Sequence, residues 1–177
     1  WVFKISIITI ILAYIFSMSA DTLVSELNIF PALATIFIII FIGVIFDVIG
    51  IAVTATSEIP FLSMASKKIK GANEALWLIK NADHVSSFCN DVVGDVCGII
   101  SGSAGGILVA RLLSFDLGVT QSFLSILMSS SIAALTVASK AIGKTFAMNN
   151  NQKIVYYVGY LLSLFFKINN KDKSIRK

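Results

Sequence analysis

Charged residues are scarce in this sequence: aspartate, glutamate, lysine and arginine make up 14 % of its 177 residues. Soluble domains carry about 25 % charged residues and about 45–50 % apolar ones, whereas this chain is 56 % apolar. So few charges could not cover the surface of a soluble domain of this length. The composition therefore predicts an integral membrane protein and excludes a cytosolic enzyme, a secreted disulfide scaffold and a nucleic-acid-binding domain.

Nucleophilic and zinc-binding residues are also few, with one histidine, His84, and two cysteines, Cys89 and Cys97. Eight residues apart on one helix, the cysteines would stand about 12 Å from each other, too far for a disulfide. A serine protease is excluded because His84 would lie about 28 Å along the helix from Ser103. No spacing suggests a zinc site or a phosphate-binding loop, and we expect a protein that is not an enzyme.

Apolar residues gather in four stretches long enough to cross a bilayer, which takes about 20 residues. They are residues 2–20, 31–56, 88–113 and 117–138. Two segments of mixed polarity predict helices along the membrane surface: a pair within residues 60–80, broken at Gly71, and one over residues 152–167.

The predicted fold is therefore an all-α integral membrane protein with three core transmembrane helices and interfacial juxtamembrane helices. Residues 1–20 form an extra N-terminal transmembrane helix, residues 31–167 the main transmembrane domain, and residues 168–177 a basic C-terminal tail. The first segment also resembles a secretory signal that ends in small residues at Ser17-Met18-Ser19. Its cleavage would leave three spans.

Basic residues predict the orientation, because short loops rich in lysine and arginine stay in the cytoplasm. Thirteen of the fourteen basic residues fit cytoplasmic N- and C-termini, whereas residues 21–30 hold two acids and no basic residue. We therefore expect a multi-pass protein of the plasma membrane with both termini inside. Its basic cytoplasmic segments are expected to bind anionic lipid headgroups.

Four charged residues lie within the predicted spans, where each costs at least about 2.5–3.5 kcal/mol unless it meets a partner or water. Asp47 lies in the second stretch, Asp91 and Asp95 in the third, and Lys140 ends the fourth. The predicted topology puts all four in the cytoplasmic leaflet, so we expect them to meet. Three acids against one lysine leave a formal charge near −2, which calls for protons or a cation.

Small and polar residues at three- or four-residue spacing extend this cluster along each span, on one helix face. The three predicted stripes are Gly43, Asp47, Gly50, Thr54 and Ser57; Asp91, Gly94, Asp95, Gly98, Gly102 and Gly106; and Ser122, Ser125, Ser129, Ala133, Thr136 and Lys140. Glycines at such spacing allow close backbone approach. We therefore expect helix packing at Gly50, Gly94, Gly98, Gly102 and Gly106.

Two segments carry a resemblance to a known family. Residues 80–90, Lys-Asn-Ala-Asp-His-Val-Ser-Ser-Phe-Cys-Asn, join an amphipathic segment to a glycine-rich span. Residues 136–147, Thr-Val-Ala-Ser-Lys-Ala-Ile-Gly-Lys-Thr-Phe-Ala, align without gaps on the pattern Thr-Val-Phe-Gly-Glu-Val-Ile-Pro-Lys-Thr-Leu-Ala. Over residues 33–166 the chain resembles the transmembrane domain of the CNNM/CorB/CorC group of magnesium-transport proteins.

The resemblance implies a homodimer that binds dehydrated Mg²⁺ between its spans, through a serine motif, an asparagine early in the next span and a glutamate. The serine motif falls best on residues 47–50, with residues 57–58 as an alternative, and the asparagine on Asn90 or, by replacement, Asp95. Lys140 replaces the glutamate. The candidate Mg²⁺ ligands are Asp47, Asp91, Asp95, Asn90 and Thr54. The family's regulatory CBS domains have no counterpart here, so we expect a trimmed piece or a lineage without nucleotide regulation.

Lys140 leaves two functions open, because a protonated ammonium cannot ligate a metal. In the first, the acids have moved the site and the protein transports a divalent cation, Mg²⁺ by resemblance. In the second, Lys140 is an internal counter-charge and the protein is a non-transporting scaffold or regulatory partner. An intramembrane aspartyl protease is a third alternative: Phe46-Asp47 and Gly94-Asp95 come near its motifs, but Val92 takes the place of a required glycine.

Overall fold

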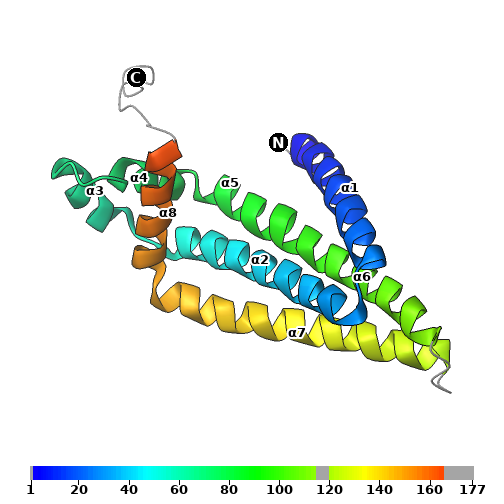
Figure 1. Ribbon diagram of the computed structural model, residues 1–177. Coiled ribbons are helices and arrows are strands. Elements are labelled where there is room, and N and C mark those ends of the chain that lie inside the picture. The colour runs from blue at the N-terminus through cyan, green and yellow to red at the C-terminus, as the bar shows by residue number, and fades with distance from the viewer. Residues whose placement is uncertain (1, 115–119, 166–177) are drawn as a thin grey trace.

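A computed structural model describes residues 2–114 and 120–165 of the chain (Figure 1). Every element in these ranges is helical, which confirms the all-α prediction. The elements are α1 (Val2–Glu26), α2 (Ile29–Ala55), α3 (Glu58–Ser66), α4 (Ala72–Lys80), α5 (Ala82–Ser87), the π-helix η1 (Phe88–Gly94), α6 (Asp95–Leu113), α7 (Gln121–Asn149) and α8 (Asn151–Phe165).

Three helical segments of the described chain are long and apolar enough to cross a membrane: Ile29–Ala55, Ala82–Leu113 and Gln121–Asn149. They match the second, third and fourth predicted stretches. The N-terminal stretch, expected as a fourth span, forms α1, whose apolar part Ile5–Ala20 is shorter than these three. Residues 21–30, which separate the first two predicted spans, are mostly helical, because α1 continues to Glu26 and α2 begins at Ile29.

The third and fourth stretches are longer helices than hydropathy predicts. The third segment begins at Ala82, with α5, η1 and α6 following one another directly, and α7 continues to Asn149 instead of ending near residue 138. Polar residues that are compatible with a helix extend both ends, and hydropathy does not detect such extensions. Lys140 consequently lies inside α7 and not at its end.

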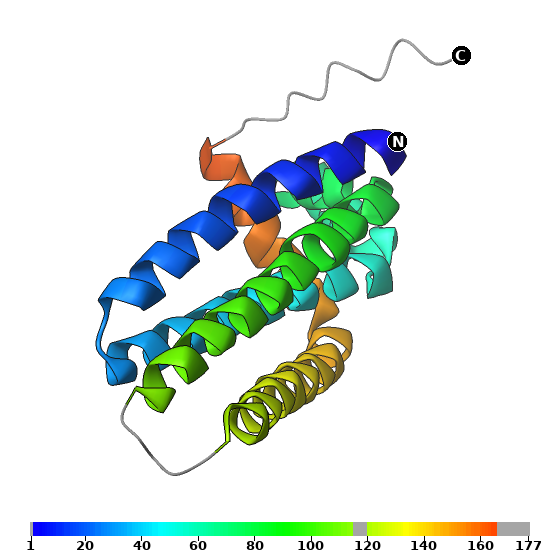
Figure 2. The same cartoon turned by 90° about the vertical axis from the view of Figure 1, so that its right-hand side faces the viewer.

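The three long segments lie side by side, and α2, α6 and α7 each pack against the other two (Figures 1 and 2). Helix α1 packs on α6, on the side away from α7. At the end of the bundle where α2 finishes, α8 contacts both α2 and α4, and α3 packs on α4. The predicted helix pair broken at Gly71 is thus present, as α3 and α4.

Two apolar clusters hold the bundle together, one toward each end of α2. One includes Ile36 and Ile40 of α2 with Ala104 and Leu108 of α6. The other joins Ala52 and Val53 to Ala147 of α7 and to the juxtamembrane helices, through Phe61, Ala75, Leu78, Ile79 and Val155. Asp47, which is only 6 % exposed, lies between these two clusters along α2.

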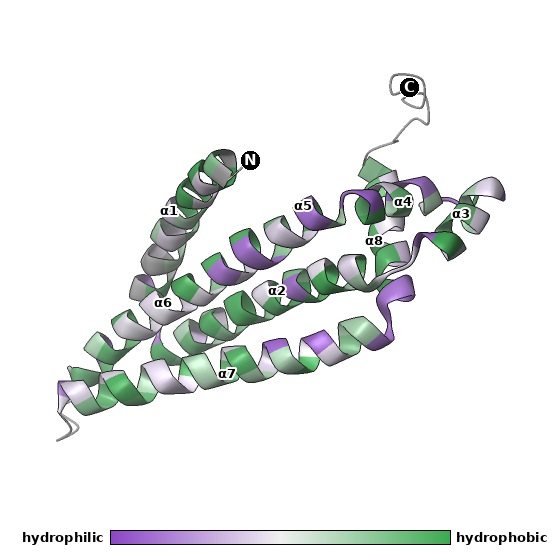
Figure 3. Ribbon diagram, turned by 180° about the vertical axis from the view of Figure 1, so that it is seen from behind, coloured by the Kyte–Doolittle hydropathy of each residue, from purple (hydrophilic) through white to green (hydrophobic). Residues whose placement is uncertain are grey.

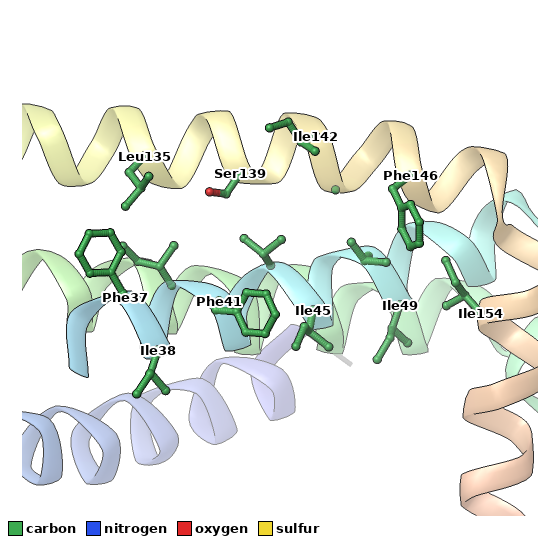
Figure 4. Close-up of a pocket in the computed structure, with 14 residues that line it drawn as sticks. Phe37, Ile38, Phe41, Ile45, Ile49, Leu135, Ser139, Ile142, Phe146 and Ile154 are labelled. Atoms are coloured by element: carbon green, nitrogen blue, oxygen red, sulfur yellow. The ribbon is translucent and has the colours of Figure 1, made fainter. Parts of the chain in front are cut away.

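Apolar side chains also cover much of the outside of the bundle, as expected for helices that face lipid (Figure 3). Helix α7 buries only Gly143 and Ala147 among its residues. An open groove of about 840 Å³ runs between α2 and α7, with Ser139 as its one hydroxyl-bearing lining residue (Figure 4). The groove holds no charged group, so the polar chemistry of the described chain lies elsewhere.

Candidate cation site

Lys140 of α7 lies between carboxylates from two other helical elements. Its Nζ is 3.0 Å from Oδ2 of Asp47 in α2 and 3.2 Å from Oδ1 of Asp95, the first residue of α6. The side chain of Asp47 is 9 % exposed, whereas that of Asp95 is 65 % exposed. One ammonium therefore ties together α2, α6 and α7, with a buried acid on its inner side and an open one on its outer side.

These groups line a pocket of about 300 Å³ together with Asn90 and Asp91. Lys144, one turn after Lys140 on the same face of α7, also lines it. Lys144 was not among the charged residues expected to meet, although its four-residue spacing from Lys140 predicts the same helix face. Three carboxylates and two ammonium groups give this pocket a formal charge of −1 instead of the expected −2.

Two buried oxygens of pocket-lining residues accept no hydrogen bond from the described residues: Oδ1 of Asp47 and Oδ1 of Asn90. A buried polar atom without a partner costs about 1–3 kcal/mol, so folded proteins rarely leave one. Both atoms are covered by the facing helix and do not open into the pocket itself.

Each of these oxygens packs against a glycine of the facing helix. A Cβ added to Gly94 of η1 would overlap Oδ1 of Asp47, and one added to Gly50 of α2 would overlap Oδ1 of Asn90. Asp47 and Gly50 are three residues apart on α2, and Asn90 and Gly94 are four apart on η1. The two helices therefore make the same oxygen-to-glycine contact in both directions, and the predicted close approach at Gly50 and Gly94 is present.

The segment that carries Asn90, Asp91 and Gly94 is a π-helix, in which the N–H of Asp95 donates to the carbonyl of Asn90 five residues earlier. Such a turn holds about one residue more than an α-turn and is frequent at functional sites. It brings Asn90 and Asp95 to the same pocket despite their five-residue separation. Sequence spacing based on the α-helical repeat does not predict this change of register.

Thr54, expected as a metal ligand, does not line the pocket. Its exposed hydroxyl donates to the carbonyl of Ile51 at 2.9 Å, within its own helix. Because a threonine in a helix can satisfy its hydroxyl on the preceding turn, position 54 needs no partner from another span.

Three of the five glycines expected to pack helices stand in open space. Nothing described lies within 4 Å of a Cβ added to Gly98, Gly102 or Gly106. The buried positions of α6 are instead Val96, Ile100, Ser101, Ala104, Gly105, Leu108 and Val109. Gly43 of the first predicted stripe packs closely against Cys97, and close contacts outside the stripes occur at Gly105 against Ile132 and at Gly143 against Val48.

The three acids do not form a ready-made metal centre. Within residues 2–114 and 120–165, no group of three or more His, Cys, Asp or Glu side chains is arranged to hold a metal ion. The expected ligands Asp47, Asn90, Asp91 and Asp95 all line the pocket, with Asp91 exposed and Lys140 lying between Asp47 and Asp95. Their role as Mg²⁺ ligands stays a prediction.

The geometry also gives no support to an aspartyl protease, whose two carboxylates share a proton at close range. Here an ammonium, and not a shared proton, connects Asp47 and Asp95.

Comparisons with protein families, with curated proteins and with solved structures find no match to this chain. The resemblance to the CNNM/CorB/CorC group therefore stays a prediction from the residues alone.

Proposed function

We propose that this chain is a membrane protein that transports a cation, with the pocket between α2, η1 and α7 as its binding site. The observation that carries the proposal is that a positive charge, the ammonium of Lys140, is held between the carboxylates of Asp47 and Asp95 in a pocket of net negative charge. Carboxylate and amide oxygens are ligands that Mg²⁺ and Ca²⁺ accept. Mg²⁺ is the ion that the resemblance implies.

The depth of the pocket supports transport. Asp47 lies eight residues before the end of α2 and Lys140 nine before the end of α7, which is about 12–14 Å by helical rise. Half of a bilayer's hydrocarbon core is about 15 Å thick. Charges at that depth mark ion pathways or water-filled cavities in membrane proteins, and the exposed Asp95 side chain shows that the pocket opens to the surface of the bundle.

The lysines near this end of the bundle support a location of the pocket in the cytoplasmic leaflet of the plasma membrane, with both termini on the cytoplasmic side. In this arrangement α1 is the additional N-terminal span, and lysines of the α3–α4 segment contact anionic headgroups. A homodimer, as the resemblance implies, would cover part of the exposed surface of α7.

Transport can be tested in liposomes that contain the purified protein and an entrapped Mg²⁺ indicator. We expect Mg²⁺ influx with the parent and its loss in Asp47→Asn, because the amide removes the buried negative charge. Asp83→Asn is the matched control, since Asp83 is an exposed acid on α5 outside the pocket. Absence of flux in the parent, or equal flux in Asp47→Asn, would contradict the proposal.

A non-transporting scaffold is the second candidate, and the two ion pairs of Lys140 favour it. They give Asp47 and Asp95 a shared internal cation and fix α7 relative to α2 and α6. A scaffold predicts that every substitution in the pocket changes stability while no variant and no parent protein moves an ion.

A further inference from the structure

We infer that the ammonium of Lys140 is a tethered cation that occupies the candidate site, and that the transported ion binds by displacing it. The inference rests on the proposed transport function and names how that site is regulated. It makes Lys140 a competitor of the cargo, and not only a structural counter-charge.

Lys140 already occupies the position of a bound cation. Its Nζ lies 3.0 Å from Oδ2 of Asp47 and 3.2 Å from Oδ1 of Asp95, so a positive charge is held between carboxylates of two helices. An ammonium and a hard metal ion seek the same carboxylate oxygens, so both ions would compete for Asp47.

The side chain of Lys140 can also move out of the pocket into water. Its side chain is 29 % exposed and contacts an open acid, Asp95, on its outer side. Lysine carries its charge on a flexible four-carbon stem and gains hydration when the ammonium reaches water. The side chain of Asp47, at 9 % exposed, has no such freedom and remains as the fixed ligand.

The charge of the pocket also favours the exchange of Lys140 for a divalent cation. With Lys140 in place the formal charge is −1, and once its ammonium has withdrawn, three carboxylates and Lys144 leave −2. One divalent cation neutralises that charge. The exchange of one ammonium for one divalent cation therefore ends in a neutral pocket, which is the less costly state inside a membrane.

Amine labelling tests the displacement without any substitution. The purified parent protein is treated with an amine-reactive reagent in MgCl₂ and in choline chloride of equal ionic strength, and the labelling of each lysine is measured by mass spectrometry. We expect Mg²⁺ to increase labelling of Lys140 several-fold and to leave Lys144 unchanged. In Asp47→Asn, the labelling of Lys140 should no longer respond to Mg²⁺.

Calorimetric titration with MgCl₂ supplies the second measurement. Lys140→Met should bind Mg²⁺ at least about tenfold more tightly than the parent, because a charge some 4 Å away opposes binding strongly at low effective dielectric. Lys144→Met removes the same charge from the same pocket but leaves the ion pairs of Asp47 and Asp95 with Lys140 in place. We therefore expect a smaller gain in Mg²⁺ affinity. Equal gains would show that charge alone matters and would overturn the inference.

Failure of the inference and failure of the transport function give different results. Flux that depends on Asp47, with labelling of Lys140 insensitive to Mg²⁺, would overturn the displacement and leave transport standing. Loss of both flux and every Mg²⁺ effect, in the parent and in Lys140→Met, would overturn both. If Lys140→Met does not fold, the labelling of the parent still decides.

Discussion

Oδ1 of Asp47 lies against Gly94 so closely that the facing position has no room for a Cβ. The carboxylate is buried, paired through its other oxygen with Lys140, and bounded by the π-helix that carries Asn90. The position of one acid in α2 therefore depends on the absence of a side chain in another helix.

Gly94→Ala should destabilise the protein by about 1–3 kcal/mol, because an inserted methyl group in a packed site forces its neighbours to move. The neighbour here is the Asp47 carboxylate, whose shift would lengthen its ion pair with Lys140. Thermal unfolding in detergent, followed by circular dichroism, measures the effect. Gly98→Ala is the matched control on the same segment, where the Cβ meets nothing within 4 Å. Equal loss in both variants would contradict the contact.

Gly50→Ala should be destabilising in the same way, through Oδ1 of Asn90. Asn90→Ala removes that oxygen, so the double variant should be more stable than the sum of the two single effects predicts. Unfolding measurements on the four proteins of this cycle give the coupling free energy. Strict additivity would show that Gly50 and Asn90 do not depend on each other.

Lys140→Met should lower stability by about 1–3 kcal/mol, below the full cost of breaking a buried ion pair because this lysine is partly exposed. Most of the loss comes from the buried Asp47 carboxylate left without its partner. Asp47→Asn added to Lys140→Met should recover much of it, whereas Asp95→Asn should not, since Asp95 is mostly exposed. Thermal unfolding of both double variants decides between the two acids.

Gly159→Ala should loosen α8 from α4. A Cβ at position 159 would lie 2.7 Å from the carbonyl oxygen of Gly71 and 2.8 Å from the Cβ of Ala75, so the two backbones must separate. We expect faster limited proteolysis within α8 and a lower unfolding temperature. Gly106→Ala, in open space on α6, should change neither. An unaltered proteolysis rate in Gly159→Ala would show that α8 is not held at this point.

Hydropathy was sufficient to locate the three long apolar segments, because apolar side chains over about 20 residues are a strong and local signal. It placed their ends incorrectly where polar residues continue the helix, as from Ala82 to Ser87 and after Ala138. The contact of Lys140 with Asp47 and Asp95 was predicted from the topology, because all three residues were expected in the same leaflet.

The details of the pocket could not be predicted from the sequence, because they depend on backbone packing. The π-helix changes which residues face α2, so Asn90 has a buried oxygen while Asp91 is exposed. The helical repeat also treats every glycine of a stripe alike, whereas only Gly94 among the glycines of the second stripe meets a neighbour. Lys144 was within reach of sequence reasoning, being one turn after Lys140.

The reciprocal contact between α2 and η1 has an evolutionary consequence. At positions 50 and 94 a Cβ would force the facing side-chain oxygen to move, so these positions are not free to change independently of positions 90 and 47. Relatives of this chain should therefore exchange Asp47 together with Gly94, and Asn90 together with Gly50. Gly98, Gly102 and Gly106 should vary without reference to either pair.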